Sequence, residues 1–157
     1  MIIDHTKLRA FANRIVAAGG SSPDEAAFVA DHLVEANLRG HDSHGVGMLV
    51  AYVRDFEAGT LKVNQKPEIV SDTGTISVWD ARAGYGQVIA HQAVEWAIKA
   101  AKQHGVAVNG LRNAHHIGRV GTYGEVAARA GMVALHFVNA RQARPGWRRF
   151  ADARGGS

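Results

Sequence analysis

Two short stretches of this chain each place a pair of histidines among glycines and small polar residues. The first runs from Arg39 to Gly45 (RGHDSHG) and the second from Asn113 to Arg119 (NAHHIGR). Histidine has the side-chain pKa closest to neutral, so it is the residue most often used to donate or accept a proton at physiological pH. Loops leave side chains accessible to a ligand, so the two stretches can meet at one site.

Each stretch offers one preferred catalytic candidate. In the first it is His44, with Ser43 or Asp42 to orient its ring. In the second, two adjacent histidines follow a predicted strand at its carboxyl end, where ligands gather in α/β sheets. We favour His116 of these two, because Gly118 follows it and leaves room for a ligand. The alternative is that all of these histidines are structural, either capping a helix or packing in the core.

A metal site is a competing use of the same residues. His41 and His44, together with His115 or His116, supply three imidazoles, which is the ligand count of some catalytic zinc centres. The spacing matches none of the strong zinc signatures, and there is no helical HExxH motif. The chain has no cysteine, which excludes disulfides, thiolate nucleophiles and cysteine-type zinc sites. We therefore expect no metal.

Two glycine patterns resemble phosphate-binding loops without matching one. Residues 84–89 (GYGQVI) carry isoleucine where the GxGxxG fingerprint requires its third glycine, and residues 118–124 (GRVGTYG) have the wrong spacing. Neither pattern indicates a Rossmann fold or a P-loop. A helix that begins after Gly118 would still present backbone N–H groups to an anion such as a cofactor phosphate.

The composition is that of a globular protein. Of the 157 residues, 46% are hydrophobic and 20% are charged, and no apolar run is long enough to span a bilayer. No signal peptide is visible, so we expect a cytoplasmic protein without membrane contact. The net charge of +4 comes entirely from residues 141–157, which hold five arginines and one aspartate. The neutral remainder gives no reason to expect nucleic acid as a partner, although a small protein that binds nucleic acid through this tail is an alternative.

Hydrophobic periodicity divides the chain into three parts. Residues 1–60 carry helical stripes, one of which begins at Ser22 and Pro23 with Glu25 as a capping-box partner. Residues 61–140 alternate strands with helices, which predicts a layered α/β domain. The expected elements are strands at 75–79, 106–108 and 133–138, a long helix at 87–104 and a short helix through 125–129. Residues 141–157 have no periodicity and form an atypical basic tail.

Four motifs, taken in order, resemble one family. They are RGHDSHGVGM (residues 39–48), GYGQV (84–88), GVAV (105–108) and NAHHIGR (113–119), and they are similar to motifs of the malate/L-lactate dehydrogenase family. This group contains ureidoglycolate, sulfolactate and 2-hydroxycarboxylate dehydrogenases. The resemblance implies part of an oxidoreductase that transfers a hydride between NAD or NADP and a malate- or lactate-like 2-hydroxy or 2-oxo acid. It also implies a homodimer and a cofactor fold that is not a Rossmann fold.

The resemblance assigns roles to particular residues. His44 beside Ser43 matches a catalytic histidine motif, and His116 matches the proton acceptor of some members. The segment that approaches the cofactor consists of His116, Ile117, Gly118, Arg119 and Val120.

The resemblance also implies a substrate site with one departure. Its expected residues are Met48, Tyr52 and Arg119. Many members carry an arginine at the position of Met48, where it pairs with the substrate carboxylate, and a buried carboxylate favours a bidentate guanidinium. We hypothesise that Arg119 supplies this charge here, because it lies close to His116 in the sequence.

A second departure concerns length. Family members continue well beyond the predicted strand at 133–138, into Pro-Phe-Gly-Gly and Gly-Thr-Asn-Pro motifs, whereas this chain runs into residues 141–157. We hypothesise a truncated or frameshifted copy with an incomplete sheet, whose unpaired edges and apolar surface favour aggregation. The alternative is a complete short enzyme that needs a partner chain.

Overall fold

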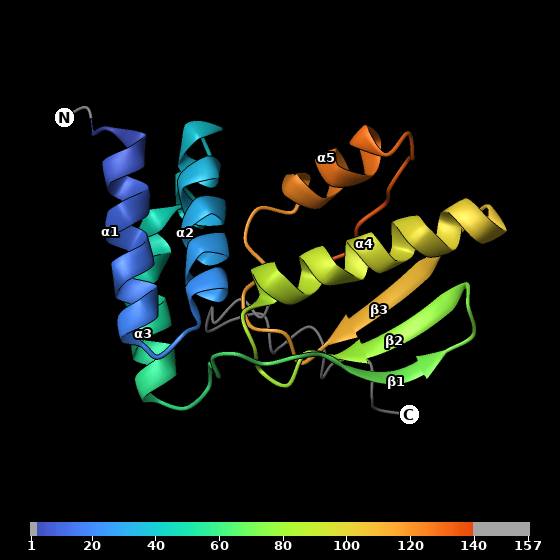
Figure 1. Cartoon of the computed structure of the whole chain (residues 1–157), viewed down its shortest axis with the longest axis horizontal. Helices are drawn as coiled ribbons and strands as arrows, with labels where there is room; N and C mark the ends of the chain where they lie inside the picture. The colour runs from blue at the N-terminus through green and yellow to red at the C-terminus, as the bar shows by residue number, and fades with distance from the viewer. Residues whose placement is uncertain (1–2, 140–157) are drawn as a thin grey trace, which may run out of the picture.

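The computed structural model describes residues 3–139, which form a helical part and an α/β part side by side (Figure 1). The helical part contains α1 (His5–Ala18), α2 (Pro23–Leu38) and α3 (Leu49–Glu57). Two short 3-10 turns, η1 (Asp42–His44) and η2 (Val46–Met48), join α2 to α3. The predicted fold class, a helical segment followed by a layered α/β unit, is confirmed. The tail predicted at residues 141–157 lies outside the described residues.

The start of α2 corrects one detail of the predicted capping box. Ser22 caps the helix as expected, with its hydroxyl accepting from the backbone N–H of Glu25 at 3.3 Å. The buried Glu25 carboxylate, however, does not reach back to Ser22. It accepts instead from the backbone N–H of Asn64 at 2.9 Å. This long-range bond ties α2 to the chain that enters the α/β part.

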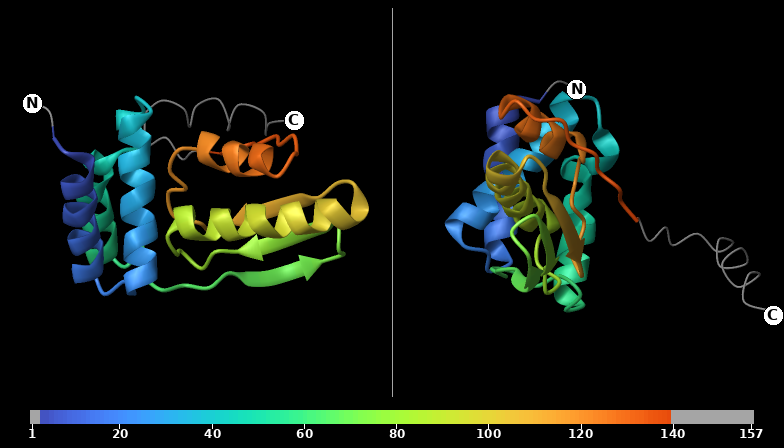
Figure 2. Two further views of the ribbon diagram at one scale, coloured as in Figure 1. Left: turned by 45° about the horizontal axis from the view of Figure 1, so that its top comes forward. Right: turned by 90° about the vertical axis from the view of Figure 1, so that its right-hand side faces the viewer.

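The α/β part is a three-stranded sheet covered by helices on one side. Its elements are β1 (Glu68–Asp72), β2 (Ile76–Asp80), α4 (Gly86–His104), β3 (Val108–Arg112) and α5 (Gly121–Arg129). The strand order is β1-β2-β3, with β1 antiparallel and β3 parallel to β2. Helix α4 lies over the sheet and α5 lies along α4 on the side away from the strands (Figure 2). None of the helices within residues 3–139 is long and apolar enough to cross a membrane.

The strands differ from the sequence predictions in three ways. β1 was not predicted, and the strand expected at 106–108 is instead β3 at Val108–Arg112. The strand predicted at 133–138 is wrong, since residues 132–139 pair with no strand among the described residues. A strand requires a hydrogen-bonded neighbour as well as an apolar sequence, and here the side chain of Phe137 is 94% exposed.

The main core lies where the helical part meets the start of α4. It joins residues of α1, α2 and α3 to Leu61 and Tyr85. A smaller contact holds α4 on the sheet, where the rings of Trp79 and Trp96 meet edge to face at 6.2 Å. The loop after β3 returns to the main core and brings the second histidine stretch to the helical part (Figure 1).

Candidate active site

The structure brings the two predicted histidines together. The rings of His44, from the 3-10 turn η1, and His116, from the loop after β3, are stacked with centroids 5.3 Å apart and an interplanar angle of 26°. The hydroxyl oxygen of Ser43 lies 2.9 Å from Nδ1 of His44, within hydrogen-bonding distance, which suits the orienting role expected of Ser43. The other candidate for that role, Asp42, bonds to Asn37 instead.

The turn that carries His44 is held by α2. Asn37, near the end of that helix, accepts from the backbone N–H of Val46 at 2.9 Å and donates to Asp42 at 2.5 Å. A side chain at Gly45 would collide with the Asn37 amide, since an added Cβ would lie 2.2 Å from its oxygen. Asn37 therefore explains why glycine follows His44, a role that the sequence analysis did not assign to it.

His116 is held by the buried side chain of Tyr52, which is itself held by the buried Gln87. Its Nδ1 lies 2.7 Å from the hydroxyl oxygen of Tyr52, on α3. That oxygen accepts from Nε2 of Gln87, on α4, at 2.5 Å. Tyr52 is 2% exposed and Gln87 is fully buried, so bulk water does not compete for these bonds. Tyr52, predicted to bind substrate, thus has its hydroxyl engaged inside the protein.

His115 turns away from the pair. Its Nε2 lies 3.0 Å from Oδ2 of Asp55, and its ring meets the edge of Tyr52 at 5.4 Å. The backbone here approaches α4 closely, because a Cβ at Gly86 would lie 2.2 Å from the carbonyl oxygen of His115. This packing gives His115 a structural position and leaves His116 facing His44.

The electrostatics of the pair favour a neutral His116. Burial, with smaller contributions from the neighbouring His44 and His115, lowers the pKa of His116 to about 4. Burial also raises the pKa of the Tyr52 phenol, which stays protonated. At neutral pH the site therefore holds an uncharged imidazole bonded to an uncharged phenol.

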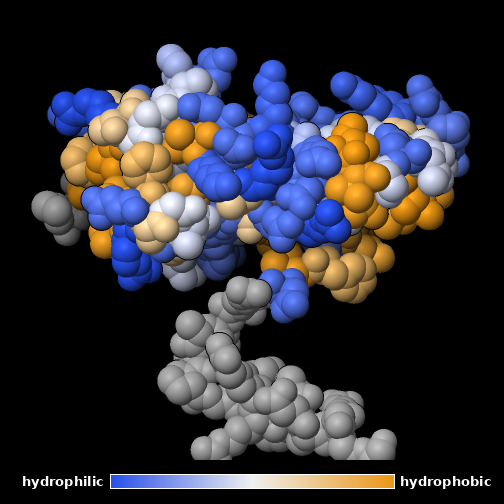
Figure 3. Space-filling model, turned by 90° about the horizontal axis from the view of Figure 1, so that it is seen from below, coloured by the Kyte–Doolittle hydropathy of each residue, from blue (hydrophilic) through white to orange (hydrophobic). Residues whose placement is uncertain are grey.

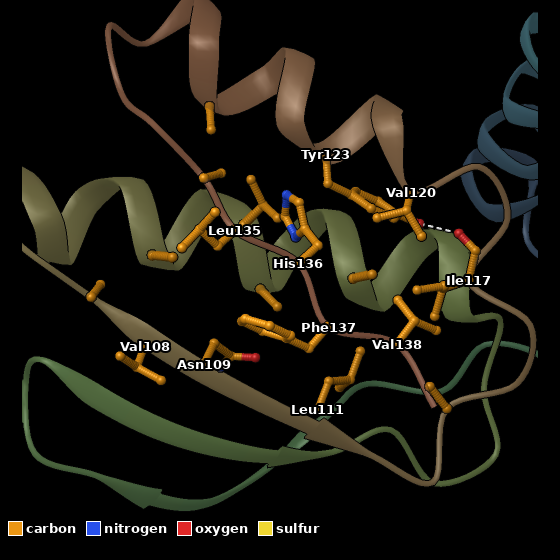
Figure 4. A pocket seen from close by; sticks show the side chains of 18 of the residues that line it. Val108, Asn109, Leu111, Ile117, Val120, Tyr123, Leu135, His136, Phe137 and Val138 are labelled. Carbon is orange, nitrogen blue, oxygen red and sulfur yellow. Dashed lines mark hydrogen bonds between the residues drawn. The ribbon is translucent and has the colours of Figure 1, made fainter. Parts of the chain in front are cut away.

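The segment predicted to approach the cofactor is fixed to α2 and α5. His32 of α2, which the sequence analysis missed, accepts at Nε2 from the backbone N–H of Arg119 at 3.1 Å. Gly118 has φ +71°, and a Cβ there would lie 2.4 Å from the same His32 nitrogen. The hydroxyl of Tyr123 donates to the carbonyl of Ile117 (Figure 4).

Two of the residues predicted to bind substrate, Met48 and Arg119, are placed differently from each other. Met48 is partly buried and packs against the main core. The guanidinium of Arg119 points at Glu125, with Nη2 of Arg119 2.7 Å from Oε1 of Glu125. The other carboxylate oxygen of Glu125 lies 3.3 Å from Nη2 of Arg39. The positive charge of Arg119 is therefore already paired within the protein.

An open cleft of about 1660 Å³ adjoins the histidine pair on the α/β side. It lies between α4, α5, β3 and the extended segment 132–139, and Figure 4 shows Leu135, His136 and Phe137 of that segment crossing it. Three residues of the predicted cofactor segment line it, namely His116, Ile117 and Val120, whereas Gly118 and Arg119 do not. The cleft thus has the His116 imidazole at its wall, and its lining mixes apolar side chains such as Ile117 and Val120 with polar ones such as Asn109 and His136.

The residues that sequence reasoning missed are those that hold the site rather than those that face it. Gln87 and His32 are polar residues on helix faces that turn inward, and only the helical period could have marked them as buried. Within residues 3–139 no group of three or more His, Cys, Asp or Glu side chains is arranged to hold a metal ion.

Comparison with known proteins gives a consistent family. Residues 3–152 match the family described as malate/L-lactate dehydrogenase. The chain is 45% identical over 136 residues to hydroxycarboxylate dehydrogenase B of Escherichia coli O157:H7, covering 87% of this chain and 38% of that protein. It is 39% identical over 139 residues to L-lactate dehydrogenase of Cupriavidus necator, covering 88% of this chain and 40% of that protein.

Solved structures give the same result for the fold. A putative malate/lactate dehydrogenase from E. coli superposes with a TM-score of 0.81 at 43% identity, over 83% of this chain and 37% of that one. Malate dehydrogenase from Pyrococcus horikoshii OT3 superposes with a TM-score of 0.80 at 33% identity, over 83% of this chain and 38% of that one. The chain therefore spans about two fifths of the length of these relatives. The family match covers nearly the whole chain, and the chain belongs to the malate/L-lactate dehydrogenase family.

Proposed function

We propose that this chain forms the proton-transfer side of an NAD(P)-dependent oxidoreductase acting on a 2-hydroxy or 2-oxo acid. The observation that carries the proposal is the stacked pair of His44 and His116, which joins the helical part to the α/β part. His116 lines an open cleft and His44 stacks on His116, so the pair suits an exchange of a proton with the oxygen on C2 of such an acid. Relatives named as lactate, malate and hydroxycarboxylate dehydrogenases support this substrate class.

The cofactor we propose is NAD or NADP, which when bound accepts or supplies the hydride. The residues present fit the nicotinamide end of such a molecule, because Ile117 and Val120 give the cleft an apolar wall next to His116. Gly118 and Arg119 contribute from behind, by holding this wall to His32. His44, His116 and Ser43 are the proposed catalytic residues.

The substrate carboxylate needs a positive partner, and we propose Arg119 for this role together with Met48 and Tyr52 as neighbours. Arg119 would have to exchange its bond to Glu125 for one to the substrate. If it does, Arg119→Ala raises KM for the 2-oxo acid at least tenfold in an enzyme of full family length, with a smaller change in kcat. An unchanged KM would leave Arg119 with only its bond to Glu125.

The remaining parts of the proposal rest on the family resemblance of the sequence. We propose that the assembled enzyme is a homodimer and acts in the cytoplasm. Sedimentation of an active preparation and fractionation of the source cells test these two points separately from the chemistry.

The decisive experiment is a graft. Residues 3–139 replace the matching segment of E. coli hydroxycarboxylate dehydrogenase B, and oxidation of NADH or NADPH is followed with a panel of 2-oxo acids. We expect activity in the graft and a loss of roughly 100-fold or more in kcat for His44→Gln or His116→Gln. His104→Gln, which alters an exposed histidine at the end of α4, serves as the matched control. A graft that stays fully active without both histidines would refute the proposed roles.

A further inference from the structure

Two buried side chains, Gln87 and Tyr52, form a continuous hydrogen-bonded chain with the partly buried His116 of the catalytic pair. Gln87 of α4 donates from Nε2 to the hydroxyl oxygen of Tyr52, and that oxygen lies 2.7 Å from Nδ1 of His116. The two lower members, Gln87 and Tyr52, are 0% and 2% exposed. Each member comes from a different part of the fold, namely α4, α3 and the loop after β3, so the chain of bonds spans the joint between the helical and α/β parts.

Counting protons along this chain fixes the state of His116. The Tyr52 hydroxyl has one hydrogen to donate and accepts one from Gln87, which leaves His116 Nδ1 as the partner for its own hydrogen. An Nδ1 that accepts a hydrogen bond carries no proton. Because burial lowers the pKa of His116 to about 4, the ring is neutral at physiological pH and keeps one proton, on Nε2.

We propose that Tyr52 and Gln87 are positioning residues that hold His116 as the neutral Nε2–H tautomer, so that it presents a hydrogen-bond donor to the C2 oxygen of the substrate. The assignment of the tautomer stands on the geometry alone, and only the identity of the recipient rests on the proposed function. It also changes the role expected for Tyr52, which acts on the substrate through His116 instead of binding it directly.

The tautomer of His116 gives the two histidines different roles, with His116 as a hydrogen-bond donor and His44 as the proton carrier. Nε2 of His116 bonds to no other group within residues 3–139, so its N–H is available to a ligand. A neutral imidazole that donates from Nε2 polarises a carbonyl and stabilises charge on its oxygen without giving up its proton. The proton that the oxygen gains in reduction, or loses in oxidation, is then carried by His44, whose ring stacks on His116 and whose Nδ1 is oriented by Ser43.

The test is a nitrogen NMR measurement on the whole chain, which needs neither substrate nor cofactor. With ¹⁵N-labelled histidine, the spectrum separates Nδ1–H from Nε2–H tautomers, and His116→Gln assigns the His116 signals by their loss. We expect His116 to be neutral at pH 7, protonated on Nε2, with Nδ1 shifted as a hydrogen-bond acceptor. A spectrum showing the proton on Nδ1 would overturn the proposal, because the bonds would then run from His116 through Tyr52 to Oε1 of Gln87.

Two variants test whether the chain of bonds sets this state. Tyr52→Phe removes the donor and Gln87→Met removes the group that fixes its direction, so we expect the Nδ1 signal to lose its hydrogen-bond shift in the first and to weaken in the second. Tyr85→Phe is the matched control, because Tyr85 is another buried phenol, 5.7 Å from the ring of Tyr52, with no bond to His116. His116 signals unchanged in Tyr52→Phe would refute the positioning role.

These measurements keep the two proposals distinguishable. If the tautomer is as expected but the graft shows no dehydrogenase activity, the positioning of His116 stands and the proposed reaction fails. If the graft is active, Tyr52→Phe in the graft should lower kcat about tenfold while changing KM less, because a hydrogen bond to the reacting oxygen matters most in the transition state.

Discussion

The helical part and the α/β part of this chain differ in how completely their side chains are buried. Helices α1 and α2 each bury an inner face in the main core, and α2 alone buries eight residues. In the α/β part, β1 has no buried residue and segment 132–139 is exposed at all but one position. Figure 3, which views the molecule from below, shows hydrophobic surface over both parts, and in the α/β part it includes the exposed strand residues Ile69 and Val108.

The difference follows from how the two kinds of element satisfy their backbones. A helix makes its hydrogen bonds within itself and needs only one apolar contact face, whereas a strand depends on a neighbour at each edge. Nearly two thirds of the E. coli relative lies outside its match to this chain. We therefore expect the β3 edge and segment 132–139 to be the places where intact relatives add polypeptide to the fold.

The largest expected effect tests this comparison directly. Leu33→Ala removes a fully buried side chain of α2 and should lower the free energy of unfolding by about 2–5 kcal/mol. Leu135→Ala makes the same chemical change at a position that is 81% exposed, and should alter stability by less than about 0.5 kcal/mol. Urea unfolding followed by circular dichroism measures both. A large loss of unfolding free energy for Leu135→Ala would mean that Leu135 is buried against other residues of the α/β part.

The exposed segment also has a predicted effect on solubility. Unpaired apolar positions promote association, so a double change of Leu135→Ser and Phe137→Ser should reduce aggregation seen by light scattering without lowering stability. Equal aggregation in the parent and the double variant would show that another surface drives association.

The joint between the two parts should depend on pH through His32. Burial lowers the pKa of His32 to about 4, against 6.5 when unfolded, with Asp31 opposing and His116, Arg119 and His91 adding to the shift. The unfolded chain therefore binds more protons between these values, and stability should fall as pH drops from 6.5 towards 4, by about 3 kcal/mol in total. Above pH 6.5 this contribution is constant.

Chemical unfolding at pH 7, 6, 5 and 4.5 checks the prediction. His32→Gln keeps an uncharged acceptor for the N–H of Arg119 and should reduce the pH dependence, leaving the part that comes from His116, whose pKa is also lowered to about 4. His104→Gln, at an exposed position, should leave the pH dependence unchanged. The prediction fails if the slope between pH 6.5 and 4.5 is the same in His32→Gln and the parent.

The sequence predicted the helical part well and the sheet poorly, for the same physical reason. The stripes and caps of these helices are local, so Ser22 and Pro23 mark the start of α2 without knowledge of the fold. The strand at 133–138 was predicted from apolar composition alone, but strand formation depends on partners elsewhere in the chain.

The same limit applies to the site. His44 and His116 could be chosen because glycines and polar residues surround them, and the structure places them together. Gln87, His32 and Asn37 hold the segments that carry the pair. The helical period could mark Gln87 and His32 as buried, but neither residue type nor spacing indicates which groups they contact. Arg119 was chosen for its charge, and its partner Glu125 became visible only in the structure.

Two glycine substitutions test how tightly the loop that contains Gly118 packs against α2. Gly118 and Gly131 have similar positive φ angles, +71° and +77°, so alanine is strained equally at both. Only at Gly118 does an added Cβ meet a neighbour, His32 Nε2 at 2.4 Å, while at Gly131 nothing lies within 4 Å. Gly118→Ala should therefore be less stable than Gly131→Ala by about 1–3 kcal/mol, the usual cost of overpacking. Equal losses of stability would show that the loop can move away from α2.

The smallest expected effect concerns how the helices of the two parts begin. Asp4 caps α1 by accepting from the backbone N–H groups of Thr6 and Lys7 at 2.9 and 3.1 Å. Helix α5 begins at Gly121, and its N-cap residue Val120 makes no side-chain capping bond. Asp4→Ala should lower the stability of the chain slightly at pH 7, because it removes the N-cap of α1. These bonds also hold the pKa of the Asp4 carboxyl below its usual value, so the difference between parent and variant should shrink as the carboxyl is protonated in acid. Val120→Ala, which removes no capping bond, is the comparison at the other helix. A difference between parent and Asp4→Ala that persists at pH 2 would mean that the aspartate stabilises α1 through something other than its charge-assisted cap.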